Sequence, residues 1–185
     1  MTGEEMRRRE EDGSGRSGDA VETPAAVVRT AAGDRSPGRA LDVATGRGRN
    51  AIFLAERGWT VDAIDISRAM LDPARERASA RGVSVEWILA DADRYCVRSA
   101  TYDLVAISFF DARDRLDGIV DGLRPGGALC YEHHLVASDA RSGPGARYRF
   151  ERGELRAAVD ELIVERYDED ADERRVELIA RAPDE

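Results

Sequence analysis

Residues 39–55 of this 185-residue chain read RALDVATGRGRNAIFLA. The apolar pattern predicts a strand over Ala40–Ala44, a break at Gly46 and Gly48, and a helix over Arg49–Arg57. Glycine lets the backbone turn sharply and a ligand approach closely, and the free amides at a helix start can donate to an anion. We interpret this stretch as a cofactor-binding loop.

The glycine spacing alone fits two kinds of cofactor. With Ala51 in the last place it matches G-x-G-x-x-A, a pattern of dinucleotide-binding proteins. With Asp42 and Thr45 it reads D-x-A-T-G-x-G. The choice between them depends on the rest of the chain.

Strands and helices alternate after this loop. Gly58 and Gly82 end helices, and the sequence Asp72-Pro73 predicts a kink or a restart in the helix that Ser67 caps. The predicted strands are Ala40–Ala44, Thr60–Ile64, Val83–Leu89, Tyr102–Phe109, Ala128–Leu135, Leu162–Tyr167 and Arg175–Arg181. Further helices are predicted at Pro24–Ala32, capped by Thr23, at Ala112–Leu123 before the turn Pro125-Gly126-Gly127, and at Glu154–Asp160.

This rhythm predicts an α/β, Rossmann-like fold. We expect a seven-stranded, mostly parallel sheet with helices on both faces. The last two strands, separated by the acidic segment Asp168–Glu173, are expected to form an antiparallel C-terminal hairpin. Residues 1–20 are polar and glycine-rich and are expected to form a disordered tail, and residues 21–185 a single domain.

Charge and composition limit the kinds of partner that the protein is expected to bind. The chain holds 28 basic and 37 acidic residues, a formal net charge of −9, which favours a small molecule over nucleic acid. No run approaches the roughly 18 apolar residues of a membrane span, and no signal-peptide core opens the chain. We therefore expect a cytoplasmic protein without a membrane partner. Cys96 and Cys130 form no C-x-x-C pair, and no metal site is indicated.

Acidic residues follow the second and third predicted strands. Asp65, 17 residues after Gly48, can accept hydrogen bonds from both hydroxyls of a ribose. Asp91, in the sequence LADAD, can accept from an exocyclic adenine amine. Both readings place a nucleoside across the carboxyl ends of the strands.

These segments together resemble the class I S-adenosylmethionine-dependent methyltransferases. LDVATGRGRN, VDAIDIS, LADAD, YDLVAISFF and LRPGGALCYE are similar to five successive motifs of that family, across Gly38 to Ala182. GRGRNAIFLAERG and GPGARYRFERGEL look most like the small tellurite-resistance and thiopurine-type members. Ala44 stands where the family often has glycine, and many members have a helical lid where this chain offers only Thr23–Gly33.

The resemblance implies S-adenosylmethionine as cofactor. Asp42 is then expected to orient the methionyl ammonium, or else to hold the loop as a hydrogen-bond acceptor. The cofactor-binding residues that the resemblance implies are Asp42, Ala44, Thr45, Gly46, Gly48, Asn50, Asp65, Ile66, Asp91, Ala92 and Ser108.

The acceptor is expected beyond the fourth and fifth strands. Asp111, His133 and His134 are the candidate bases, and we assign Asp111 and His133 as catalytic residues. Because His134 follows His133 on a strand, we expect the two side chains to face opposite sides of the sheet, so that at most one of them faces the pocket. Candidate substrate-binding residues are Phe110, His134, Arg147 and Tyr148.

Three functions follow from these patterns. The first is methyl transfer to a small-molecule or oxyanion acceptor by in-line displacement. The segment Ser108-Phe-Phe-Asp111 lacks the N/D-P-P-Y/F tetrad of nucleic-acid amino-methylating enzymes, which again favours a small acceptor. The alternatives are a non-catalytic S-adenosylmethionine-binding protein and a nicotinamide-dependent oxidoreductase.

Overall fold

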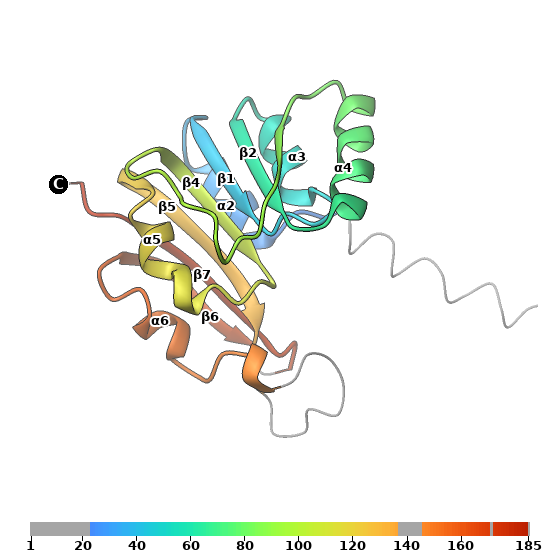
Figure 1. Ribbon diagram of the computed structural model, residues 1–185. Coiled ribbons are helices and arrows are strands. Elements are labelled where there is room, and N and C mark those ends of the chain that lie inside the picture. The colour runs from blue at the N-terminus through green and yellow to red at the C-terminus, as the bar shows by residue number, and fades with distance from the viewer. Residues whose placement is uncertain (1–22, 137–145, 171, 185) are drawn as a thin grey trace, which may run out of the picture.

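The computed structural model describes residues 23–136, 146–170 and 172–184. One seven-stranded sheet runs through it in the order β3-β2-β1-β4-β5-β7-β6 (Figure 1). Strands β1 to β5 pair in parallel, and β7 is antiparallel to both β5 and β6. The strands are β1 Arg39–Val43, β2 Thr60–Asp65, β3 Glu86–Leu89, β4 Tyr102–Ser108, β5 Leu123–His134, β6 Ile163–Asp170 and β7 Arg175–Arg181.

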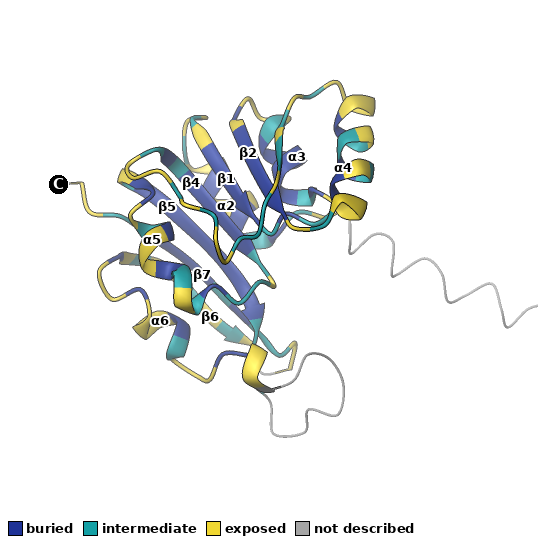
Figure 2. Cartoon of the chain, viewed as in Figure 1, coloured by how far each residue is buried: buried dark blue, intermediate teal, exposed yellow. Residues whose placement is uncertain are grey.

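Helices cover both faces of this sheet. α2 (Ala26–Gly33) and α3 (Arg49–Ala55) bury their apolar side chains against one face, and α5 (Leu116–Val120) and α6 (Glu154–Ala157) against the other. α4 (Arg68–Ala80) packs on β2 and β3. Figure 2 shows the central strands buried between these layers. The predicted Rossmann-like fold, its parallel order and its C-terminal hairpin are confirmed.

The central strands are apolar on both sides because helices cover both faces. In β4, Leu104 and Ala106 pack toward α2 and α3, whereas Val105 and Ile107 pack toward α5. The edge strand β3 is only partly buried. The carboxyl ends of β1 to β5 therefore meet along one edge of the sheet, where a ligand of such a fold binds.

Several predicted boundaries are wrong. α2 begins at Ala26 after an N-cap at Ala25, so Thr23 does not cap it. α4 runs through Pro73 without a restart, because one lost hydrogen bond is outweighed by burial of Leu71, Ala74 and Ala78. Other helices and strands shift by one to three residues at their ends, and β3 is shorter than predicted.

The predicted helix Ala112–Leu123 is much shorter in the structure. A 3-10 turn, η2 (Arg113–Arg115), leads into the five-residue α5, whose interior holds Gly118, a poor helix former. The predicted turn Pro125-Gly-Gly lies inside β5, between the pairs Leu123↔Tyr102 and Ala128↔Leu104. The strand therefore starts five residues before the predicted Ala128, with an irregularity where the glycines allow one.

Two predictions fall wholly or partly outside the described residues. These are the disordered tail at residues 1–20 and residues 138–145 of the expected loop Ser138–Phe150. The end of that loop carries a 3-10 turn, η3 (Ala146–Tyr148). No helix in the described ranges is both long and apolar enough to cross a membrane.

Candidate active site

The glycine loop and the end of β2 are tied together by Asp65. Its Oδ2 accepts a hydrogen bond from the amide of Gly46 at 2.8 Å, and its Oδ1 accepts one from the amide of Ser67 at 2.8 Å. The carboxylate is 9% exposed. Because a carboxylate offers about four acceptor sites, both oxygens retain capacity for ribose hydroxyls.

The two loop glycines serve different purposes. Both have a positive φ, +57° at Gly46 and +76° at Gly48. A Cβ at Gly46 would have no atom within 4 Å, whereas one at Gly48 would lie 2.5 Å from the ring of Trp87. Gly46 therefore leaves open space for a ligand, and Gly48 makes room for the packing of β3 against the loop.

Ala44, where the resembled family often has glycine, has a φ of +52°. This is the left-handed region, which costs a residue with a Cβ roughly 1 kcal/mol. The chain tolerates the methyl group, as the sequence suggested, and the strain sits at the start of the cofactor loop.

Asp42 lies inside the loop as a structural acceptor. It is 1% exposed, and its Oδ2 accepts hydrogen bonds from the Thr45 hydroxyl and from the Ala51 amide at 3.1 Å. Burial raises the pKa of this carboxyl from 3.8 to about 6, although the hydrogen bonds from Thr45 and Ala51 oppose the shift. These contacts match the loop-holding reading of Asp42.

Asn50 joins three elements at the same edge. Its Oδ1 accepts from the amide of Ala25 at 2.9 Å, and its Nδ2 donates to the hydroxyl of Ser108 at 3.0 Å. At 2% exposed, Asn50 fastens α2 to α3 and β4. It thereby fixes Ser108, the last residue of β4, beside the loop.

The nucleoside side of the edge carries the remaining predicted residues. Ile66 is 69% exposed beside Asp65, and Ala92 packs on the core. The carboxylate of Asp91 accepts from the amide of Asp93 at 3.0 Å, which shapes the turn after β3. Ile66 therefore presents an exposed apolar surface beside the carboxylate at the end of β2.

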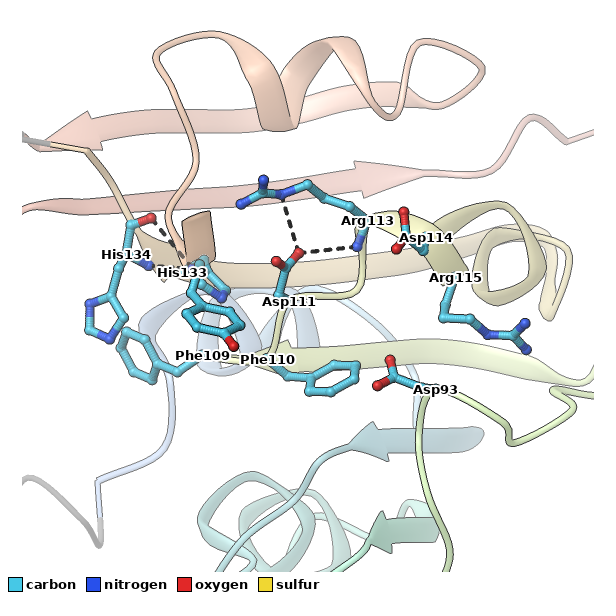
Figure 3. A pocket seen from close by; sticks show the side chains of 10 residues that line it. Asp93, Phe109, Phe110, Asp111, Arg113, Asp114, Arg115, His133 and His134 are labelled. Carbon is cyan, nitrogen blue, oxygen red and sulfur yellow. Dashed lines mark hydrogen bonds and ion pairs between the residues drawn. The ribbon is translucent and has the colours of Figure 1, made fainter. Parts of the chain in front are cut away.

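A cavity of about 740 Å³ opens next to this edge (Figure 3). It gathers side chains from the loops after β3 and β4, from the end of β5 and from η3. Its walls hold the predicted residues Phe110, Asp111, His133, His134 and Tyr148, together with Asp93, Phe109, Arg113, Asp114 and Arg115. Arg147 does not line it; its guanidinium lies over the ring of Tyr148.

His133 is held rigidly at the cavity wall. Its Nδ1 accepts a hydrogen bond from the amide of His134 at 2.8 Å, and its ring packs edge-on against Phe150, 5.3 Å between centroids. Burial lowers the pKa of His133 below its usual value, although the hydrogen bond with the backbone of His134 opposes the shift. The imidazole is therefore neutral at pH 7.

Asp111 is paired within the same cavity. Its Oδ1 lies 3.2 Å from Nε of Arg113, whose Nη1 is 3.3 Å from Glu154 and whose Nη2 donates to the carbonyl of Arg149 at 2.7 Å. Figure 3 shows the carboxylate pointing at this guanidinium. The network ties the loop after β4 to the segment before α6.

Sequence reasoning missed a buried ion pair at this edge. Glu132, 1% exposed in β5, accepts a hydrogen bond from Arg49 in the first turn of α3, and Arg175 of β7 lies 3.9 Å from its other oxygen. The partners are far apart in sequence, so no local pattern signals them. Both guanidiniums lie 5.7 Å from the ring centroid of Phe109.

Phe109 lies outside the core, after the end of β4. It is 40% exposed, with a φ of +55°, and its ring lies 4.7 Å from that of His134. A bulky residue in this conformation is strained, and such strain is typical of binding sites.

Comparisons with known proteins agree with this geometry. Residues 40–127 match the sequence family described as "Methyltransferase domain". Over 103 residues the chain is 37% identical to demethylmenaquinone methyltransferase of Thermus thermophilus, covering 52% of this chain and 47% of that protein. Over 99 residues it is 35% identical to tRNA 5-carboxymethoxyuridine methyltransferase of Escherichia coli, covering 49% of this chain and 38% of that protein.

The fold has solved counterparts as well. The crystal structure of TehB from Haemophilus influenzae superposes with a TM-score of 0.72 at 19% identity, over 84% of this chain and 61% of that one. The chain spans about half or less of the length of the curated relatives it matches. Fold, motif order and family match agree: residues 40–127 are similar to a methyltransferase domain, and the chain has the fold of S-adenosylmethionine-dependent methyltransferases.

Proposed function

We propose that this protein transfers the methyl group of S-adenosylmethionine to a small-molecule acceptor in the cavity. The observation that carries this proposal is that predicted cofactor residues and cavity residues are direct neighbours in the sequence. The predicted cofactor residues Ala92 and Ser108 are followed directly by the cavity residues Asp93 and Phe109. A cofactor bound at the carboxyl ends of the strands would therefore lie next to an acceptor bound in the cavity.

The residues present fit this cofactor. Gly46 leaves open space, Asp65 retains acceptor capacity, and Ile66 offers an exposed apolar surface. The glycine loop carries two cationic side chains that could meet a pyrophosphate, those of Arg47 and Arg49. The side chain of Arg49 is already paired with Glu132. The bound cofactor supplies a methyl group on a sulfonium, an electrophile that needs no activation by metal or acid.

The chain's own residues then position the acceptor. Phe109 and Phe110 present apolar ring surface to the cavity, and Asp111 and His133 present polar groups. Methyl transfer is an in-line displacement, so holding the nucleophile about 3 Å from the methyl carbon and excluding water provide much of the rate enhancement.

The acceptor is proposed to be a small molecule or an oxyanion. The net charge of −9 supports this choice. The relative that acts on tRNA makes nucleic acid the competing acceptor. A non-catalytic S-adenosylmethionine-binding protein is the second candidate function, because both residues assigned as catalytic are engaged: Nδ1 of His133 by an amide and Asp111 by Arg113.

Transfer of labelled methyl groups tests the proposal. The protein is incubated with S-adenosyl[methyl-³H]methionine and either a metabolite extract or total tRNA. We expect label in a small organic product and none in tRNA. Label in tRNA alone would show that the acceptor is a nucleic acid and not a small molecule. Binding of S-adenosylhomocysteine with no labelled product in either arm would favour the non-catalytic candidate.

A further inference from the structure

Both histidines of the chain line the acceptor cavity. Neighbouring side chains on a strand point to opposite faces, so at most one was expected to face the pocket. That expectation is wrong, because His134 is the last residue of β5 and is only partly buried, so its side chain reaches round the end of the sheet. Figure 3 shows its ring beside that of Phe109, whereas the ring of His133 lies nearer Asp111. The cavity therefore holds two imidazoles with different surroundings.

The ring of His133 is not available as a base. The amide of His134 donates to its Nδ1 at 2.8 Å, which is shorter than the 3.4 Å from Nδ1 to the carbonyl of His134. Nδ1 is therefore the acceptor, and the neutral ring carries its hydrogen on Nε2, which leaves no free lone pair. Asp111 is tied up as well, because its carboxylate forms an ion pair with Arg113.

The ring of His134 is free of such contacts. No described residue forms a hydrogen bond with either of its ring nitrogens, and neither nitrogen is a buried unpartnered atom. The residue is nevertheless held in place: its amide donates to His133, and its carbonyl accepts from the amide of Phe150 at 3.0 Å. The ring of Phe109 packs against it at 4.7 Å, and the neutral ring of His133 lies 5.7 Å away. An oriented ring with a free nitrogen is suited to proton transfer.

The groups around His134 keep its imidazole neutral at pH 7. Burial lowers the pKa of His134, and the guanidiniums of Arg149, before α6, and Arg175, on β7, lower it further. Glu132 on β5 opposes this shift, but it is also paired with Arg49 of α3. A neutral imidazole with an unengaged lone pair can remove a proton.

The charges of the cavity wall disfavour an acceptor that arrives as an anion. Its charged lining residues are Asp93, Asp111, Asp114, Arg113 and Arg115, three acidic and two basic. The guanidinium of Arg113 is already paired with Asp111 and lies 3.3 Å from Glu154. An acceptor that keeps its proton until the reaction avoids repulsion by this wall, and such an acceptor needs a base.

We infer that His134 is the general base of methyl transfer, and that the acceptor enters the cavity with a proton still on its attacking nitrogen or oxygen. This inference rests on the proposed function and narrows its acceptor to compounds that are not preformed anions. The free ring nitrogen of His134 takes that proton as the acceptor's lone pair forms a bond to the methyl carbon and the carbon–sulfonium bond breaks. The products are the methylated acceptor, S-adenosylhomocysteine and an imidazolium, which returns its proton to solvent.

Chemical rescue tests this assignment. His134→Ala removes the proposed base, and His133→Ala, which removes the neighbouring imidazole from the same cavity, is the matched control. Methyl transfer from S-adenosyl[methyl-³H]methionine to the metabolite extract is measured with and without added imidazole. Melting temperature and S-adenosylhomocysteine affinity are measured on both variants, to show that the fold and the cofactor site remain intact. An NMR titration of the two histidines gives a readout that needs no acceptor, because each variant assigns the signal of the other residue.

We expect His134→Ala to lose roughly 100-fold or more in rate at pH 7, the usual contribution of a general base, and added imidazole to recover about tenfold or more. The recovery should increase with the neutral fraction of the imidazole as pH rises. Imidazole should leave the rate of His133→Ala unchanged, whatever that rate is. In the NMR titration of wild type, His134 should be neutral at pH 7.

Three results would overturn the inference: a wild-type rate in His134→Ala, a loss that imidazole does not reverse, or equal rescue of both variants. An imidazolium signal from His134 at pH 7 would also overturn it. Failure of S-adenosylhomocysteine to bind wild type, or binding without any labelled product, would instead contradict the proposed function, and the inference would fall with it.

Discussion

At the scale of single residues, Gly46 and Gly48 form a natural pair for testing the loop. Both need a left-handed backbone, so alanine at either position costs roughly 1 kcal/mol. Gly48→Ala also forces a Cβ to within 2.5 Å of Trp87, an overpacking that costs about 1–3 kcal/mol more. We expect Gly48→Ala to have the lower melting temperature, and Gly46→Ala to lose cofactor affinity with the smaller loss of stability. Equal melting temperatures in calorimetry would contradict the packing role of Gly48.

We predict that the carboxylate of Asp65 binds the ribose of the cofactor. Asp65→Asn keeps one oxygen as an acceptor for loop amides but removes the charge and the second acceptor oxygen. We expect a loss of about tenfold or more in S-adenosylhomocysteine affinity by titration calorimetry, with a cooperative unfolding transition retained. Asp93→Asn, in the nearby turn, is the matched control and should bind as wild type does. Unchanged affinity in Asp65→Asn would show that this carboxylate does not bind the ribose.

The residue scale also shows where sequence reasoning ends. The place of Asp65 at the end of β2 could be predicted from the sequence, whereas its role in binding the ribose stays a prediction. Asp42 has two possible tasks, and only its contacts with Thr45 and Ala51 distinguish them. The tautomer of His133 depends on a hydrogen bond that no sequence pattern encodes.

At the scale of elements, the Arg49–Glu132 pair fastens α3 to β5 at the edge of the site. Arg49→Met would leave the buried Glu132 with the longer contact to Arg175, at 3.9 Å, and breaking a buried pair costs about 3–5 kcal/mol. Arg81→Met, which removes the exposed pair with Glu56, is the control and should cost at most about 1 kcal/mol. Urea unfolding measures both losses. Adding Glu132→Gln to Arg49→Met should restore much of the lost stability; no recovery would place the loss elsewhere.

The elements were predicted better in type and order than in extent. All seven strands were identified, the central ones because buried parallel strands are continuous apolar runs. The helix expected over Ala112–Leu123 was too long, because its apolar spacing is helical while Gly118 and Gly122 prevent a long helix. At Pro73 the sequence predicted an interruption, yet α4 continues through it. Burial of the apolar face of α4 outweighs a single missing hydrogen bond.

At the scale of the whole molecule, Asp42 makes stability depend on pH. Its folded pKa of about 6 exceeds its ordinary 3.8, so between about pH 4 and 6 the folded state holds more protons than the unfolded state. The contribution of this group to stability therefore falls as pH rises through that window, by about 3 kcal/mol in total. Asp42→Asn lacks this titration. Relative to wild type, we expect the variant to gain about 2.4 kcal/mol in unfolding free energy between pH 4 and pH 7. An equal difference at both pH values would contradict the buried-carboxyl account.

The two halves of the site differ in how far the sequence alone predicts them. The cofactor half follows from motifs in a known order along one strand edge, whereas the acceptor half depends on loops whose contacts form only in the fold. Asp111, His133, His134, Phe110 and Tyr148 were proposed separately and do share one cavity, but the roles of Arg113 and Glu132 entered only through the structure.

The central claim is that S-adenosylmethionine binds the edge formed by the Gly46 loop and Asp65. The most direct measurement is a thermal and calorimetric titration of the full chain with S-adenosylhomocysteine, with NADH in parallel. We predict binding of S-adenosylhomocysteine at one site and, at about 100 times its Kd, a stabilisation of roughly 2.7 kcal/mol, with no effect of NADH. Stabilisation by NADH without any by S-adenosylhomocysteine, or by neither ligand, would contradict the claim.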